Sequence, residues 1–130
     1  MHLAKFLSLA PICVLMACQA KITQPINRQL VRIAGTSSEI VCKVRQIARD
    51  EKLSFHYGTA DKSIGTMNTF RLIGEGYEIT MVNDLQLEEY DLRLYANSGQ
   101  QSPEYVIAQE KFSAVRQFVI GPTPKGCLAE

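Results

Sequence analysis

The sequence lacks the residue sets that most catalytic and metal-binding sites require. It contains only two histidines and no Cys-x-x-Cys pair, so a zinc site would have to draw its ligands from scattered carboxylates. It has no Gly-x-Ser-x-Gly elbow and no glycine-rich loop of the kind that cradles phosphate. We therefore expect a protein that is not an enzyme and that needs no metal or other cofactor.

Other absences narrow the class of protein further. No apolar run reaches the roughly 20 residues that a membrane-spanning helix needs. The 14 Lys and Arg residues are balanced by 13 Asp and Glu residues, so the chain has no large excess of positive charge to attract nucleic acid. Internal repeats and low-complexity segments are also absent. A chain of 130 residues has room for one small domain.

The N-terminus, in contrast, has the composition of an export signal. Lys5 gives a basic start, and a short apolar segment over residues 6–16 follows it. This segment closes in the run Leu15-Met16-Ala17-Cys18. The run resembles the signal of bacterial lipoproteins, in which a leucine stands three positions before the cysteine and a small residue directly precedes it.

This resemblance implies that residues 1–17 are removed as a signal peptide and that Cys18 carries lipid. The cysteine would bear a diacylglyceryl thioether and an N-acyl chain, and stable anchoring requires more than one such chain. In that family an Asp after the cysteine is the usual inner-membrane retention signal, whereas Gln19 stands here. The expected location is therefore the outer membrane, facing the periplasm. The alternative is an ordinary cleaved signal with a chance cysteine.

Residues 18–36 have mainly the composition of a tether, with the alternative that part of the segment docks on the domain. They are mainly polar, Pro25 and Gly35 interrupt them, and their apolar residues follow neither a period of 2 nor one of 3.6. At roughly 3.3 Å per residue, such a tether could hold a domain as much as about 60 Å from the bilayer. We assign the single folded domain to residues 37–130.

Cleavage and lipidation leave two cysteines for pairing, Cys42 and Cys127. In an oxidising compartment a disulfide is the default expectation for such a pair. A metal or redox site is the alternative, but the mature chain offers His56 as its one histidine. We predict a bridge between Cys42 and Cys127.

Two segments have the pattern of helices. After Ser37 and Ser38, either of which could cap the helix, apolar residues form a stripe at 100° per residue, and Cys42 falls on the opposite side. That position is well placed to hold a C-terminal tail against the outside of the helix. A second helix is expected to begin at Ser102-Pro103 and to stop at Gly121-Pro122.

Between the helices the apolar period changes to two, which indicates strands with one buried face. The alternating apolar residues are Leu53, Phe55 and Tyr57, then Phe70 and Leu72, then Tyr77, Ile79 and Met81, and finally Tyr90, Leu92 and Leu94. Residues 74–76 form a glycine-rich hairpin connection. These elements predict an α+β fold, a two-layer sandwich in the order helix, four-stranded antiparallel sheet, helix, with both helices on one face of the sheet.

The other face of this sheet is the candidate binding surface. Alternation puts Glu78, Glu89, Asp91 and Arg93 on it, and no base occurs between Arg71 and Arg93. We interpret it as an acidic face that receives a basic protein partner. The alternative is an ordinary solvated face with cross-strand ion pairs.

These observations favour an outer-membrane lipoprotein that faces the periplasm and binds another protein, in envelope maintenance or in the assembly of an envelope machine. The alternative is a tethered periplasmic inhibitor or immunity protein that neutralises a toxin or a cell-wall hydrolase, for which small size, a disulfide and an acidic face are also suited. A hydrolase would need a concave site that the pattern does not indicate.

Overall fold

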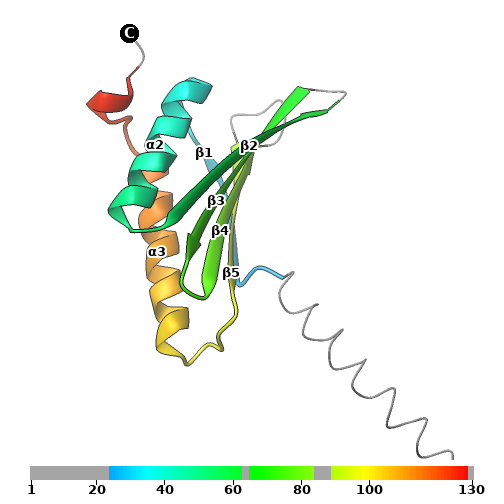
Figure 1. Ribbon diagram of the computed structural model, residues 1–130, viewed down its shortest axis with the longest axis vertical. Helices are drawn as coiled ribbons and strands as arrows, with labels where there is room; N and C mark the ends of the chain where they lie inside the picture. Colours follow the sequence, from blue (N-terminus) through cyan, green and yellow to red (C-terminus); the bar gives the residue numbers. More distant parts are fainter. Residues whose placement is uncertain (1–23, 63–64, 84–88, 129–130) are drawn as a thin grey trace, which may run out of the picture.

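The computed structural model describes residues 24–62, 65–83 and 89–128. Within these residues the chain forms two layers, a twisted sheet and a pair of helices that cover one of its faces (Figure 1). The predicted α+β class, with both helices on the same face of an antiparallel sheet, is therefore confirmed. Cys18 and the predicted signal peptide lie outside the described residues.

The strands are β1 (Asn27–Arg32), β2 (Ser54–Lys62), β3 (Gly65–Gly74), β4 (Tyr77–Asn83) and β5 (Glu89–Ala96). The helices are α2 (Ser37–Asp50), α3 (Pro103–Ile120) and a short 3-10 turn, η1 (Lys125–Cys127). The strands pair antiparallel throughout, in the order β1-β5-β4-β3-β2. The four strands expected from the period of two are all present.

The fifth strand, β1, corrects the sequence analysis, which predicts a four-stranded sheet and a tether over residues 18–36. Asn27–Arg32 pairs with the last strand, β5, along its whole length, and both Val31 and the following Ile33 are buried in the core. The tether prediction is therefore wrong for this stretch. Residues 18–23 lie outside the described part of the chain.

Helix α2 begins at a different cap from the one expected. Thr36, not Ser37 or Ser38, is the N-cap: its Oγ1 accepts a hydrogen bond from the Glu39 amide at 3.2 Å, and Glu39 Oε1 accepts one from the Thr36 amide at 2.8 Å. This reciprocal pair is a capping box, and it satisfies two amide groups that the first turn would leave unpaired. The buried stripe of the helix is the expected one and includes Ile40, Val44, Ile47 and Ala48.

Helix α3 has the predicted limits. Ser102 caps it, Pro103 takes the first position, and Gly121 follows its last residue. Its inner side is fully buried at Ala108, Phe112, Val115 and Val119. These residues pack against the apolar face of the sheet, and the core therefore lies between the two layers.

The charged residue Lys43 of α2 extends to the C-terminal end of α3. Its side chain is buried, and its Nζ donates a hydrogen bond to the Gly121 carbonyl at 2.6 Å. No basic residue stands in the last turn of α3, so Lys43 supplies from α2 the cation that a helix C-terminus favours. Burial lowers the pKa of Lys43 below its ordinary value.

The tail after α3 returns to the outside of α2, where Cys42 and Cys127 form a disulfide with their Cα atoms 5.5 Å apart. The predicted bridge is confirmed, as is the position of Cys42 on the side of α2 away from the sheet. The covalent bond holds η1 against α2 in a place where the tail has little apolar surface to bury.

Candidate functional site

The face of the sheet opposite the helices carries no other element of the described chain (Figure 1). We call it the open face. One register row of this face runs across all five strands. Arg28 of β1 is paired with Arg93 of β5, and Arg93 with Thr80 of β4. Thr80 is in turn paired with Arg71 of β3, and Arg71 with His56 of β2. Directly paired residues of antiparallel strands point to the same side of a sheet. Three arginines and a histidine are thus aligned across five strands.

At one end of this row, Asp91 holds two of the arginines. Arg28 donates from Nε to Asp91 Oδ1 and from Nη2 to Oδ2, both at 3.0 Å. Arg93 donates to the same Oδ2 from Nη2 at 2.9 Å and from Nε at 3.1 Å. One carboxylate is therefore shared between two guanidinium groups.

Asp91 and Arg93 affect each other's ionisation. Burial acts to raise the pKa of Asp91, but hydrogen bonds from Arg28 and Arg93 and the charges of these arginines outweigh it, and the pKa lies below 3.8. The pKa of Arg93 is raised by its hydrogen bonds to Asp91 and Tyr95 and by the negative charge of Asp91. Asp91 is consequently charged at any pH near neutral.

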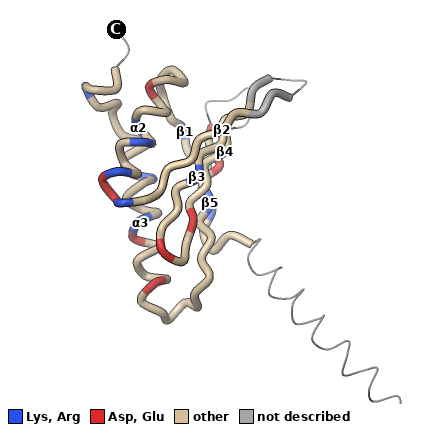
Figure 2. The backbone as a smooth tube through the Cα atoms, in the orientation of Figure 1, with Lys and Arg blue, Asp and Glu red and all other residues tan. Residues whose placement is uncertain are grey.

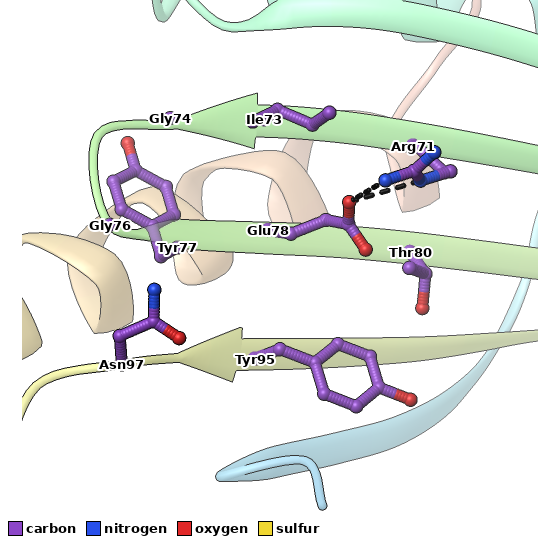
Figure 3. A pocket seen from close by; sticks show the side chains of 9 residues that line it. All are labelled: Arg71, Ile73, Gly74, Gly76, Tyr77, Glu78, Thr80, Tyr95 and Asn97. Atoms are coloured by element: carbon purple, nitrogen blue, oxygen red, sulfur yellow. Dashed lines mark hydrogen bonds and ion pairs between the residues drawn. The ribbon is translucent and has the colours of Figure 1, made fainter. Parts of the chain in front are cut away.

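The neighbouring ion pair joins Arg71 to Glu78 across β3 and β4. Arg71 donates to Glu78 Oε1 from both Nε and Nη2. Figure 3 shows this pair, with Thr80 and Tyr95 beside it on the next positions of the sheet. Charged, hydroxyl and aromatic side chains thus lie next to one another on this part of the open face.

Two depressions hollow this surface. One of about 700 Å³ extends from Arg71 and Glu78 to the β3–β4 turn and includes Ile73 (Figure 3). A second, of about 370 Å³, extends the other way and includes Val82 and Asp91. Both are lined by Arg71, Thr80 and Tyr95. The two depressions are therefore adjacent parts of one shallow, open concavity.

The residues that the sequence selected as partner-binding do share this face, but its charge differs from the expected one. Glu78, Asp91 and Arg93 lie within the ion pairs described above, and Glu89 is the register partner of Arg32. Strand β1 contributes Arg28 and Arg32, and positive and negative positions are mixed along the strands (Figure 2). The expectation of an acidic face took no account of β1, whose arginines add positive charge to it.

In the part of the chain that the structure describes, no three His, Cys, Asp or Glu side chains gather as potential metal ligands. The described helices include none that is long and apolar enough to cross a membrane. The arrangement of the open face is suited to binding through charge and shape.

Comparison of the chain with protein-family models, curated proteins and solved structures finds no match.

Proposed function

We propose that this protein is an outer-membrane lipoprotein that faces the periplasm and acts as a non-catalytic protein-binding module. The observation that carries the proposal is the open face, a hollowed and uncovered sheet surface whose depressions are lined by Tyr95 together with Arg71 and Arg93. Arg and Tyr are enriched at the centres of protein interfaces. The disulfide between Cys42 and Cys127 supports a location in an oxidising compartment.

The position of β1 also affects how far the domain extends from its anchor. If Cys18 carries the lipid, about nine residues separate it from the start of β1 at Asn27, and an extended chain of that length spans about 30 Å. This is about half the reach expected from a tether over residues 18–36. The partner would accordingly act close to the membrane surface, as expected for envelope maintenance or for assembly of an envelope machine.

The hypothesis of a tethered inhibitor or immunity protein loses part of its support, since it drew on an acidic face. It is separated from the proposed role by genome neighbourhood, because an immunity protein is expected to be encoded beside its toxin. A gene for a toxin or a wall hydrolase directly adjacent to this one would favour the inhibitor hypothesis.

Lipidation is tested by Cys18→Ser. We expect the unaltered chain to incorporate a fatty-acid probe and to fractionate with membranes, and the Cys18→Ser variant to do neither. Cys13→Ser is the matched control, because it removes a cysteine from inside the predicted signal and should leave labelling intact. Equal labelling of the Cys18→Ser variant would refute the lipoprotein proposal.

Binding at the open face is tested by a photo-crosslinking amino acid at Tyr95 in intact envelopes. We expect discrete adducts that contain a second protein. The same crosslinker at Arg49, an exposed position on α2, serves as the control and should give none of these adducts. Identical adduct patterns at the two positions, or none at Tyr95, would contradict a binding role for the open face.

A further inference from the structure

The charges of the open face are arranged in layers. The side chains of Arg28 and Arg71 are 55% and 52% exposed, and that of Arg93 is 38% exposed. The carboxylates that pair with them are covered more fully, with Glu78 26% exposed and Asp91 18% exposed. The long guanidinium side chains lie outermost and the shorter acidic ones beneath them, so an approaching molecule meets mainly positive charge.

Pairing within the face does not neutralise this outer layer. Arg28 and Arg93 share the single carboxylate of Asp91, which leaves one positive charge in surplus at that end of the row. At the other end, Arg71 gives Nε and Nη2 to one oxygen of Glu78, so its Nη1 group remains a donor for an incoming anion. His56 extends the row beyond Arg71.

The concavity is centred on this row. Arg71 and Arg93 flank Thr80 on the strand between them, and neighbouring strands are about 4.8 Å apart, so the two arginine backbones are about 10 Å apart. Thr80 and Tyr95 add hydroxyl groups at the same place (Figure 3). Ile73 in one depression and Val82 in the other provide apolar surface on either side.

We infer that this row is a docking site for an acidic segment of a protein partner, whose carboxylates lie over Arg71 and Arg93 and whose apolar side chains enter the two depressions. The inference rests on the proposed function. It assigns negative charge to the docking segment of the partner, whereas the sequence alone predicts a basic partner. The apolar lining favours a polypeptide over a lipid headgroup or free phosphate, because neither of these would use Ile73 or Val82.

The test uses the full chain in a non-ionic detergent and, as probes, fluorescent hexaglutamate, a peptide of alternating Glu and Leu, and hexalysine, measured by anisotropy at low salt. We expect the two acidic peptides to bind and hexalysine not to bind, with the Glu-Leu peptide tighter than hexaglutamate. Arg71→Gln with Arg93→Gln should weaken the acidic peptides about tenfold. Arg49→Gln with Lys125→Gln removes the same charge from exposed positions outside the sheet and should change binding less than about twofold.

A second variant separates loss of charge from loss of structure. Arg71→Lys with Arg93→Lys keeps the positive charges and should retain most of the binding, and the melting temperature of each variant reports whether the fold is intact. Equal binding of acidic peptides to the wild type and the glutamine double variant would overturn the inference. So would preferential binding of hexalysine.

Vesicles distinguish a lipid ligand from an acidic protein segment. The wild type and the glutamine double variant are compared on phosphatidylglycerol vesicles and on phosphatidylcholine vesicles. If the protein binds phosphatidylglycerol vesicles through the arginines and binds no acidic peptide, the row is a site for lipid headgroups and the inference is overturned. The proposed function has a separate test: it is contradicted if the crosslinker at Tyr95 captures no protein in envelopes, whatever the peptides do. A protein captured there through a basic segment would leave the proposed function standing and remove the inference.

Discussion

At the scale of single residues, Asp91 affects both the stability of the sheet and the charge of the open face. It joins β5 to β1 through Arg28, an exposed partner that is 63 positions away in the chain. Because the arginines hold its pKa below 3.8, the folded state favours the charged carboxylate more than the unfolded state does. Such a group contributes stability above its ordinary pKa, and the contribution is lost as the pH falls through the lower pKa of the folded state.

Asp91→Asn should therefore be less stable than the wild type by about 1 kcal/mol near neutral pH, a modest value because the arginine partners are largely exposed. The difference should shrink once the pH falls below 3.8. Urea denaturation from about pH 7 to about pH 2 measures it. Glu75→Gln, which removes an exposed carboxylate in the β3–β4 turn, is the control and should cost less at neutral pH. A pH-independent difference for Asp91→Asn would contradict this account.

Lys43 gives a second pH-dependent prediction at this scale. Its pKa is lowered by burial, so between the folded-state value and 10.5 the unfolded chain binds more protons, and the contribution of this group to stability rises with pH. In the Lys43→Met variant this contribution is absent, because methionine does not bind a proton. We expect the free energy of unfolding of the wild type, measured relative to Lys43→Met, to increase from about pH 7 to about pH 10. A constant or decreasing difference would show that Lys43 is not the group responsible.

At the scale of elements, β1 is the part of the fold with the weakest local signal. Only Val31 within the strand and Ile33 just after it are buried apolar residues, and Leu30 points the other way with 63% exposure. A short edge strand of this kind gains its stability from its partner strand and from the core, not from its own sequence. Packing against the rest of the protein therefore determines whether this segment joins the sheet.

Substitution of the two sides of this strand distinguishes a strand from a tether. Ile33→Ala should lower the free energy of unfolding by about 2 to 4 kcal/mol, because it leaves a cavity in the core. Leu30→Ala should change it by less than about 0.5 kcal/mol, because that side chain lies on the open face. Chemical denaturation of the two variants is the measurement. Similar, small effects at both positions would support a tether.

At the scale of the whole molecule, the disulfide connects helix α2 to the C-terminal tail. It joins residues that are 85 positions apart, and the loop it closes contains β2, β3, β4, β5 and α3. Strand β1 lies outside that loop and is held by noncovalent contacts, which are its pairing with β5, core packing, the Arg28–Asp91 ion pair and a hydrogen bond from Asn27 to Gln109 of α3. The C-terminal tail is thus attached to the domain by a covalent bond, whereas β1 is attached by noncovalent contacts.

Removing the bridge with Cys42→Ser and Cys127→Ser should lower the free energy of unfolding by about 2 to 4 kcal/mol. The chain-entropy limit for a loop of this size is about 4 to 5 kcal/mol. Thiol titration of the denatured mature chain should find no free cysteine. The reduced wild type is the control and should match the double variant. Two free thiols in the unreduced protein would refute the bridge.

The sequence by itself determined the elements whose pattern is local. The apolar stripes of α2 and α3, the period of two in four strands and the capping residues of α3 are each set by residues a few positions apart. The pairing of Cys42 with Cys127 followed from elimination, because the predicted cleavage and lipidation would leave no other cysteines.

Only the tertiary structure decided that Asn27–Arg32 belongs to the sheet and that Arg28, Arg93 and Arg71 share one row. Local alternation fixes the face on which a side chain lies, whereas the neighbour and the register of a strand depend on contacts with distant segments. The tertiary structure also decided that the arginines of the open face are more exposed than the carboxylates with which they pair.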